Sequence, residues 1–466
     1  MAVETKAASE FEFSIPVLIV GAGGCGLTAA LAARDHGADV LVLERDPKVW
    51  GTTAMSTGLI PAAGTPEQGE AGIEDSPELF AKDIQAKAKG KADQTIVEHL
   101  ARESAETVGW LQKTHGLPLT LVDGFLYPGH SVRRMFGMPN RSGAELMARL
   151  ESACAEAGAD IMCDATVRTL YVDGDRVTGV AIERPDGSIE DIGCESLILA
   201  CCGFAGNEEM VIRYIPELEG ATFNGHPGNK GDAILWGEVL GASIRDLDAY
   251  QGHAGLAYGH GVPINWPTIM EGGFQVNTNG LRFSNEAKGY SEQAVKVLAQ
   301  PDKVAYTVFD QRIYDVMTQF DDFMQAVEAG AIHKADTVEE LAAKIKVPAD
   351  ALQKSFNEAE ASRTSGEADQ FGRVFNGARP GLSAPFYAVK VTGAIFHTQG
   401  GLEVNTEARV LKADGTPFAN LFAGGGAARG VSGSGADGYI AGNGLLTATT
   451  LGKIAGRAAA KQVTGA

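Results

Sequence analysis

Runs of apolar residues predict four buried strands, and a helical pattern joins the first two. Val17–Val20 and Asp39–Leu43 flank a helical stretch over Leu27–His36, an order that is typical of a βαβ unit. Two further apolar runs, Ser196–Ala200 and Asn420–Ala423, also lead into small residues. We expect these strands to form a parallel sheet that binds a ligand at their carboxyl ends.

Periodic patterns also predict the elements between and after these strands. Apolar residues at helical spacing favour helices over Gln94–Thr114, Ser142–Ala157 and Asn443–Lys461. Val167–Ile182 instead alternates between apolar and polar positions, which predicts a hairpin with its turn at Asp173-Gly174-Asp175. The chain is therefore expected to combine parallel and antiparallel strands with helices.

The composition and the periodic pattern of the sequence change between residues 255 and 386. This region has charged helical stretches over Pro301–Ala329 and Thr337–Ala361, and it lacks the glycine-rich strand ends of the rest. We therefore predict an α/β fold in which a Rossmann-like domain is discontinuous, with residues 1–254 as its first part and residues 387–466 as its second. Residues 255–386 are predicted to form an inserted α+β capping and catalytic domain.

Composition narrows the class of protein. The 466 residues exceed one typical core, and 59 acidic against 39 basic residues give a net charge of −20, which argues against nucleic-acid or anionic-membrane partners. No apolar run reaches the roughly 20 residues of a membrane span, and the polar start at residues 1–13 is unlike a signal peptide. The cysteines have no paired CxxC spacing, which predicts buried thiols in a reducing cytoplasm and no metal site. They are Cys25, Cys154, Cys163, Cys194, Cys201 and Cys202.

The first predicted strand leads into a glycine motif that is typical of dinucleotide binding. Gly21-x-Gly23-x-x-Gly26 follows the strand and opens the helix, and Glu44 ends the next strand. The first glycine permits the turn, the second lets backbone N–H groups approach a pyrophosphate, and the third lets helix and strand pack closely. The helix N-terminus adds partial positive charge, and Glu44 is placed to accept hydrogen bonds from ribose hydroxyls.

A second segment carries a family resemblance. Trp50-Gly51-Thr52-Thr53-Ala54-Met55-Ser56-Thr57-Gly58 resembles the GGTTAxSxG segment of the fumarate reductase and 3-ketosteroid 1-dehydrogenase flavoproteins. Three further segments are similar to this family in the same order, Leu199–Phe204, Gly228–Asp232 and the terminal Gly424–Gly444. The resemblance extends over essentially the whole chain, and it implies that FAD lies across the first domain.

The resemblance also implies a set of FAD-binding residues. These are Gly21, Gly23, Gly24, Gly26, Glu44, Arg45, Gly51, Thr52, Thr53, Ser56, Gly58, Ala200, Gly203, Asp232, Gly424, Gly425, Asn443, Gly444 and Leu445. Two positions depart from the family. Met55-Ser56-Thr57 lacks the His that bonds FAD covalently in membrane-bound members, so we expect non-covalent FAD. Ala423-Gly424-Gly425 stands where the family has Ala-Gly-Glu, so a usual cofactor hydrogen bond is missing or supplied elsewhere.

One tyrosine distinguishes between the two chemistries of the family. Asn277–Tyr290 resembles the G-x-RF-x-NE motif, after which fumarate reductases place an Arg acid and ketosteroid dehydrogenases a Tyr base. Tyr290 stands at this position and points to desaturation. A Tyr titrates near pKa ~10, and a helix start capped by Ser291 would stabilise its phenolate, although Glu292 would oppose this. The alternative is an aromatic lid without proton transfer.

Three further residues complete the predicted catalytic set. Tyr127 lies in a Tyr-Pro segment that resembles the one from which ketosteroid dehydrogenases relay the proton of the base, and a loop Tyr is the alternative. Tyr439 replaces the Arg that binds a carboxylate in fumarate reductases, so its hydroxyl, or backbone N–H groups of residues 433–438, would polarise a ketone oxygen. His397 lies in a segment similar to the HTMGG of fumarate reductases, whose His holds a substrate carboxylate; a core His is the alternative.

These residues predict an FAD-dependent desaturase of the ketone-desaturating branch. Tyr290 removes the α-proton of a small, cyclic ketone, and a hydride passes to flavin N5. A ketone that also bears a carboxylate, such as 4-oxocyclohexanecarboxylate, fits the mixture of Tyr and His. The alternatives are an ene reductase of an unsaturated acid, a 3-ketosteroid dehydrogenase, and a flavin-binding scaffold without catalysis. The electron acceptor, whether oxygen, a quinone or a carrier, stays open.

Overall fold

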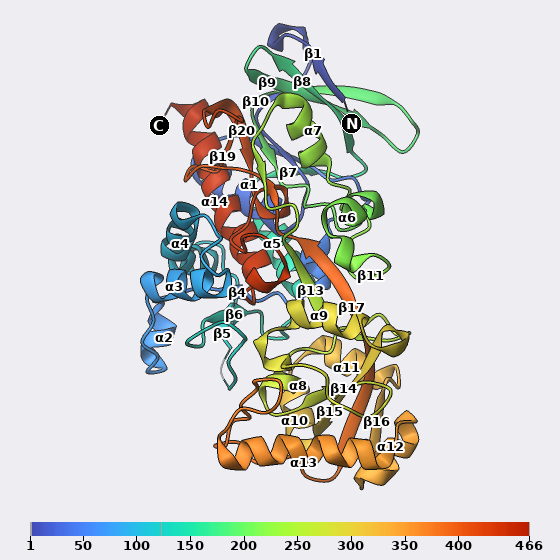
Figure 1. Cartoon of the computed structure of the whole chain (residues 1–466). Helices are drawn as coiled ribbons and strands as arrows, with labels where there is room; N and C mark the ends of the chain where they lie inside the picture. Colours follow the sequence, from blue (N-terminus) through green and yellow to red (C-terminus); the bar gives the residue numbers. More distant parts are fainter. Residues whose placement is uncertain (1, 123, 466) are drawn as a thin grey trace.

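The computed structural model describes residues 2–122 and 124–465, and its largest sheet has nine strands. Seven follow one another in the order β1-β8-β9-β10-β2-β3-β7, while β20 pairs with β10 and β19 with β20 (Figure 1). Their bounds are β1 Ala2–Thr5, β2 Ser14–Val20, β3 Val40–Leu43, β7 Asp160–Met162, β8 Thr166–Asp173, β9 Arg176–Glu183, β10 Ile189–Leu199, β19 Arg409–Leu411 and β20 Pro417–Ala423.

The four predicted strands lie in the parallel part of this sheet. β20, β10, β2, β3 and β7 are parallel neighbours in that order. Helix α1, Gly24–Asp35, follows β2, and helix α14, Asn443–Thr464, packs closely against it. A Cβ at Gly456 would lie 2.0 Å from the carbonyl oxygen of Ala29, so this glycine allows the two backbones to touch. The predicted βαβ unit is confirmed.

The predicted hairpin is also confirmed. β8 and β9 pair in antiparallel fashion, and Asp173 lies opposite Arg176 across the turn. Gly174 takes a positive φ of 58°, which a residue without Cβ adopts at no steric cost. The helices predicted over Gln94–Thr114 and Ser142–Ala157 are α4, Gln94–Lys113, and α5, Gly143–Glu156, with Asp93 and Ser142 as N-caps.

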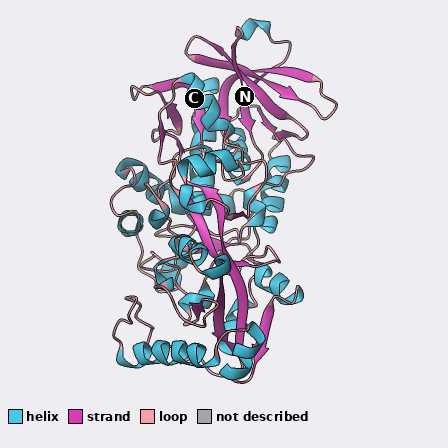
Figure 2. Cartoon of the chain, turned by 45° about the vertical axis from the view of Figure 1, so that its right-hand side comes forward, coloured by secondary structure: helices cyan, strands magenta, loops and turns pink. Residues whose placement is uncertain are grey.

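A second sheet is built around one long strand. β17, Phe386–Thr398, runs from the cap towards the first sheet and pairs with four strands (Figure 2). The sheet comprises β11 Thr222–Phe223, β13 Tyr250–Ala257, β14 Phe274–Val276, β15 Val304–Asp310, β16 Ile332–Ala335 and β17. We propose 1–254, 255–386 and 387–466 as domain limits. β11, most of β13 and most of β17 lie outside 255–386, so these strands would connect the two domains.

One sequence prediction is wrong in the cap. The expected helical stretch Pro301–Ala329 contains the strand β15, whose seven residues are all buried between β14 and β17. A strand buried on both faces lacks the two-residue alternation that distinguishes a half-exposed strand from a helix. The rest of the stretch forms the short helices α10, Gln311–Met317, and α11, Asp321–Glu328.

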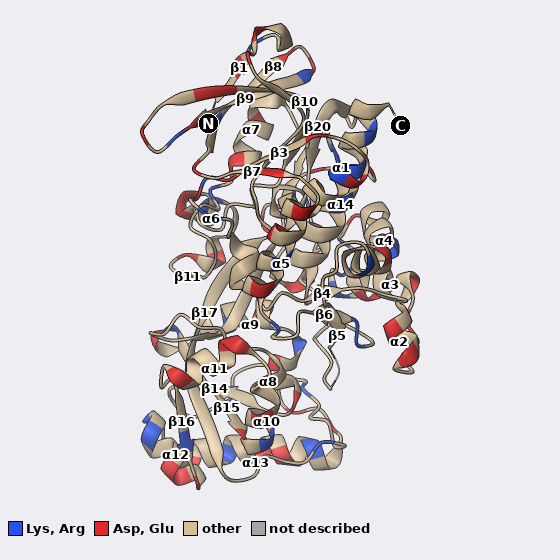
Figure 3. Cartoon of the chain, turned by 180° about the vertical axis from the view of Figure 1, so that it is seen from behind, with Lys and Arg blue, Asp and Glu red and all other residues tan. Residues whose placement is uncertain are grey.

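The remaining elements surround the two sheets. The helices are α2 Pro66–Glu70, α3 Pro77–Lys87, α6 Glu208–Tyr214, α7 Asp232–Leu240, α8 Pro267–Met270, α9 Tyr290–Leu298, α12 Val338–Ile345 and α13 Ala349–Ser365. Short strands and 3-10 turns include β4 Ile60–Pro61, β5 Thr120–Leu121, β6 Met135–Gly137, β12 Ile244–Arg245, β18 Gly401–Leu402, η2 Thr52–Met55 and η4 Glu286–Lys288. Among the described residues, no helix combines the length and apolarity that crossing a bilayer requires. Acidic side chains are spread over several elements, α2 and α12 among them, rather than gathered in one patch (Figure 3).

Candidate active site

A cavity lies at the carboxyl ends of the parallel strands. Gly21, Glu44, Ala200 and Gly425 line it, and they follow β2, β3, β10 and β20 respectively. Residues from the cap, among them Tyr290, line the same cavity. This is the position at which open parallel sheets bind ligands.

The glycine motif gives the cavity an anion-binding end. Gly21 has a φ of 104°, and a Cβ at Gly26 would lie 1.8 Å from the carbonyl oxygen of Gly21, so both positions require glycine. Gly23, by contrast, has nothing within 4 Å of a built Cβ and is the N-cap of α1, and as a glycine it has no side chain to cap the helix. The α1 N-terminus faces the cavity, where Gly23, Gly24 and Cys25 line the wall, and such a helix start fits the pyrophosphate of a dinucleotide.

Glu44 is held beside the glycine motif by two backbone hydrogen bonds. One of its carboxylate oxygens accepts a hydrogen bond from the Ala22 N–H at 2.9 Å, and the other accepts from the Asp46 N–H at 3.1 Å. Each carboxylate oxygen has a second lone pair, so both can still accept from ribose hydroxyls. The next residue, Arg45, forms an ion pair with the buried Asp232.

The segment around η2 packs on the glycine motif at the start of α1. Thr53 Oγ1 accepts from the Gly24 N–H at 3.2 Å, and Thr52 Oγ1 accepts from Asn229 Nδ2 at 2.8 Å. Ser56 turns back on its own loop, where Oγ donates to the Thr53 carbonyl at 2.7 Å. These bonds fix the loop against α1. The glycine motif, Glu44 and this loop together fit FAD.

The predicted FAD-binding residues divide into two groups. Those that line the cavity are Gly21, Gly23, Gly24, Glu44, Arg45, Gly51, Thr52, Thr53, Ser56, Ala200, Gly425, Gly444 and Leu445. Gly26, Gly58, Gly203, Asp232, Gly424 and Asn443 do not line it and instead support its wall. A Cβ at Gly203 would lie 2.0 Å from Thr398 Oγ1, for example, and Asn443 Nδ2 donates to Ser432 Oγ at 3.0 Å.

The fold brings the three predicted tyrosines to the other end of the cavity. The rings of Tyr290 and Tyr439 are 5.8 Å apart, and their hydroxyl groups are hydrogen-bonded to each other. The Gly444 N–H, in the first turn of α14, also donates to the Tyr439 hydroxyl. Tyr127 lines the cavity beside them. Residues 433–438, whose N–H groups were the alternative ketone binders, do not line it, whereas Gly444 does.

The environment of Tyr290 differs from the sequence prediction. Tyr290 is itself the first residue of α9 and Gly289 is the N-cap, whereas the Ser291 hydroxyl donates to the Tyr250 carbonyl at 3.2 Å. Burial, then the neighbouring phenols and Glu292, raises the pKa of Tyr290 well above its ordinary value. Glu292 forms an ion pair of 2.5 Å with Lys87, which offsets part of its charge.

His397 lies against Tyr439 but carries no charge near neutral pH. The two rings are 5.7 Å apart, and a Cβ at Gly444 would lie 2.7 Å from His397 Nε2. Burial lowers the pKa of His397 to about 4, with only the Thr398 carbonyl opposing this. His397 can therefore form a hydrogen bond with a substrate, but it supplies no positive charge to a carboxylate.

Several residues that the sequence did not single out also line this end. His253 stacks on Phe396 at 4.8 Å and lies 5.1 Å from the Tyr290 ring, and Trp266 packs against Tyr290 at 5.8 Å. His253 Nδ1 accepts from the Gly255 N–H, so Nε2 carries the proton of the neutral ring. Burial lowers the pKa of His253 to about 3. A single His within a buried strand gives no sequence signal that distinguishes it from a core residue.

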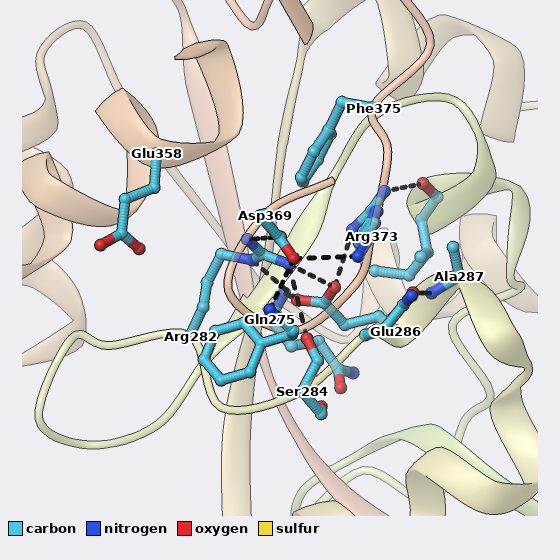
Figure 4. Close-up of polar contacts among 12 residues, drawn as sticks. Gln275, Arg282, Ser284, Glu286, Ala287, Glu358, Asp369, Arg373 and Phe375 are labelled. Carbon is cyan, nitrogen blue, oxygen red and sulfur yellow. Dashed lines mark hydrogen bonds and ion pairs between the residues drawn. The ribbon is translucent and has the colours of Figure 1, made fainter. Parts of the chain in front are cut away.

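A buried ion cluster joins the segment directly before Tyr290 to the loop after α13. Arg282 and Arg373 both bind the Glu286 carboxylate, at 3.0 and 2.9 Å, and Arg282 also binds Asp369 (Figure 4). Glu286 further accepts from the Gln275 N–H at 3.0 Å. The RF-x-NE motif is therefore a structural anchor, which ties η4 and the start of α9 to β14 and to the loop after α13.

Comparisons with known proteins agree with this geometry. The family model described as FAD binding domain matches residues 16–445. The probable fumarate reductase Ifc3 of Shewanella frigidimarina (strain NCIMB 400) is 32% identical over 96% of this chain and 74% of that protein. The 4-oxocyclohexanecarboxylate 2-dehydrogenase of Sinomonas cyclohexanicum is 26% identical over 94% of this chain and 93% of that protein.

A solved structure has the same fold. The 3-ketosteroid-Δ4-(5α)-dehydrogenase from Rhodococcus jostii RHA1, crystallised with 4-androstene-3,17-dione, superposes with a TM-score of 0.78 at 25% identity. The similarity covers 99% of this chain and 100% of that one.

Proposed function

The chain belongs to the FAD binding domain family and is an FAD-dependent oxidoreductase, and from this premise we propose that it desaturates a small cyclic ketone. The double bond would form between the carbons α and β to the carbonyl. The observation that carries this proposal is the convergence of Tyr290, Tyr439 and Tyr127 at one end of the cavity. The named ketone dehydrogenase of Sinomonas cyclohexanicum supports the same class of substrate.

Each residue would have a separate role. FAD supplies the two-electron acceptor when it is bound. The Tyr439 hydroxyl and the Gly444 N–H would hold the ketone oxygen and stabilise the negative charge that develops on it. Tyr290 would take the α-proton, since a phenolate is a strong enough base for a weakly acidic C–H bond, and Tyr127 would relay the proton of Tyr290 onward by releasing its own as it accepts. His253, Trp266 and Phe396 would pack around the ring and exclude water.

The charges around the cavity favour a ketone without a carboxylate. Among the described residues that line the cavity, Arg45 is the one Lys or Arg side chain, and it is paired with Asp232 at the nucleotide end. His397 is neutral near pH 7 because burial lowers its pKa to about 4. Arg141 acts electrostatically on Tyr127, but it does not line the cavity and donates to the Gly137 and Met138 carbonyls. A substrate carboxylate would therefore be desolvated beside the tyrosines without direct contact with a cation.

An ene reductase of an unsaturated acid is the second candidate, and the relative named as a probable fumarate reductase is the observation that favours it. Anaerobic mixing of the FAD-loaded protein with ketones and with fumarate separates the two. We expect cyclohexanone to bleach the oxidised flavin band faster than 4-oxocyclohexanecarboxylate does. Chemically reduced protein should stay bleached when fumarate is added. Rapid reoxidation by fumarate, with no bleaching by either ketone, would replace the desaturase proposal with the reductase.

We also propose that FAD is bound without a covalent bond. No His stands among Met55, Ser56 and Thr57, which line the cavity beside the glycine motif. Acid precipitation of the purified yellow protein should therefore leave the flavin in the supernatant, with the chromatographic retention of FAD. Yellow colour that stays with the washed precipitate would contradict this. A non-flavin protein precipitated with added FAD is the control for trapping.

A further inference from the structure

We propose that Asp322 and Asn265 form a second recognition point in the substrate cavity, which selects ketones that carry a hydroxyl or ammonium group away from the carbonyl. This inference rests on the proposed function and names the class of its substrate further. Both side chains come from the cap: Asp322 lies in the first turn of α11, and Asn265 lies between β13 and α8. Both line the same cavity as Tyr290 and Tyr127.

The hydrogen bond within this pair leaves one acceptor atom without a donor. The Asn265 side chain donates to the Asp322 carboxylate, which fixes the orientation of the amide. Its oxygen Oδ1 is then buried, and it has no hydrogen-bond partner among the residues that the structure describes. The residue as a whole is 6% exposed. A buried acceptor without a partner destabilises the empty site, and a ligand that donates a hydrogen bond would remove this penalty.

The charge of Asp322 is also uncompensated. Neither Lys nor Arg pairs with it in the described part of the chain, and the charge that acts on it comes from Asp321. Burial, with a smaller contribution from Asp321, raises the pKa of Asp322 to about 6 although the Asn265 bond opposes this. The carboxylate is therefore mostly ionised at pH 7. An ionised acceptor beside a second acceptor attracts a hydroxyl or ammonium group and repels a carboxylate.

A purely structural role for Asp322 can be tested against its neighbour. An acidic residue in the first turn of a helix stabilises that helix through the helix dipole, and α11 has two of them, Asp321 and Asp322. Asp321 is exposed, whereas Asp322 is the one that lines the cavity. Asp321→Asn is therefore a matched control, because it removes the same charge from the same helix turn without changing the cavity.

Binding of phenols tests the proposal without any turnover. A phenol can take the place of the ketone at Tyr439 and Gly444, and its aromatic ring cannot be desaturated further. Four phenols have the same eight-carbon skeleton and differ in the polar atoms on the second carbon of the arm: 4-ethylphenol has none, tyrosol has a hydroxyl, tyramine has an ammonium group, and 4-hydroxyphenylacetate has a carboxylate. Titration of the oxidised, FAD-loaded protein with each, followed by the change of the flavin absorption band, gives four dissociation constants.

We expect tyrosol and tyramine to bind about tenfold or more tightly than 4-ethylphenol, because a hydrogen bond to a charged group has this effect. We expect 4-hydroxyphenylacetate to bind most weakly. Asp322→Asn should bring tyramine and 4-hydroxyphenylacetate close to 4-ethylphenol, and Asn265→Ser should reduce the preference for tyrosol. Asp321→Asn should keep the order of the four constants, because it removes a charge that raises the pKa of Asp322 and so leaves Asp322 ionised at pH 7. An unchanged flavin spectrum in each variant shows that the site is folded.

Four equal constants in the unchanged protein would overturn the proposal, and so would a preference that survives both Asp322→Asn and Asn265→Ser. A preference for tyrosol but not for tyramine would mean that the second recognition point selects hydroxyl groups. A preference for tyramine but not for tyrosol would mean that it selects ammonium groups. Failure of the desaturase proposal is a separate outcome, since it appears as ketones that do not bleach the flavin while the order of phenol binding persists.

Discussion

Replacement of Tyr290 with Phe is expected to lower the rate of flavin reduction by a ketone substrate about 10²–10⁴-fold, which is the range that general acid–base groups contribute. The change removes the hydroxyl that is hydrogen-bonded to Tyr439 and keeps the ring that packs against His253 and Trp266. FAD content should not change, because Tyr290 lies at the end of the cavity remote from the glycine motif. The loss is therefore expected in the chemical step and not in binding.

Stopped-flow mixing under anaerobic conditions measures this rate directly. Tyr306→Phe is the matched control, because Tyr306 is equally buried, on β15, but does not line the cavity. The pKa of Tyr290 is raised, so its phenolate fraction, and with it the rate in the unchanged protein, should keep rising up to about pH 9 and beyond. The Phe variant should lose this dependence. If it keeps more than about a tenth of the rate, Tyr290 is an aromatic lid and the base is another group.

Local patterns in the sequence predicted the part of the fold that binds the nucleotide. The glycine motif, the strand before it and the helix after it are determined by steric and periodic requirements within some thirty residues, and their boundaries were correct to within a few residues. The same holds for the helical stretches predicted over Gln94–Thr114 and Ser142–Ala157, which differ from α4 and α5 by no more than one residue at each end. Such features need no information on tertiary contacts.

Tertiary contacts explain what the sequence did not predict. His253, Asn265 and Asp322 line the same cavity from β13, the segment after it and α11, and nothing in the sequence around each one marks it as a site residue. β15 was mistaken for a helix because burial on both faces removed its alternation. The N-cap of α9 was placed at Ser291, a typical capping residue, but the fold uses the Ser291 hydroxyl to join α9 to β13 and gives the cap to Gly289.

The second large effect is expected at the ion cluster that anchors Tyr290. Glu286 is fully buried, and its carboxylate is shared by Arg282 and Arg373, with Asp369 completing the network (Figure 4). The two arginines bring two positive charges into the interior, and the two carboxylates balance them. Salt bridges and hydrogen bonds with Arg282 and Arg373 lower the pKa of Glu286 despite its burial, so it is ionised at neutral pH.

Glu286→Gln keeps the volume of the side chain and removes one negative charge from this balance. The interior is then left with an uncompensated positive charge, and breaking a buried pair in this way typically lowers the free energy of unfolding by about 3–5 kcal/mol. Because η4 leads directly into α9, the start of the helix that carries Tyr290 should also lose its fixed position. We therefore expect flavin reduction by ketone to slow at temperatures at which the variant is still folded and still binds FAD.

Urea denaturation followed by circular dichroism measures the loss of stability, and Glu358→Gln is the matched control. Glu358 lies on α13 outside the cluster, where it forms a half-exposed pair of 3.8 Å with Lys354, and such surface pairs contribute about 0–1 kcal/mol. A Glu286→Gln variant that is destabilised no more than Glu358→Gln would mean that Asp369 alone compensates both arginines. A destabilised variant with an unchanged rate of flavin reduction would mean that the contacts of Ser291 and Lys87, rather than the ion cluster, hold Tyr290 in place.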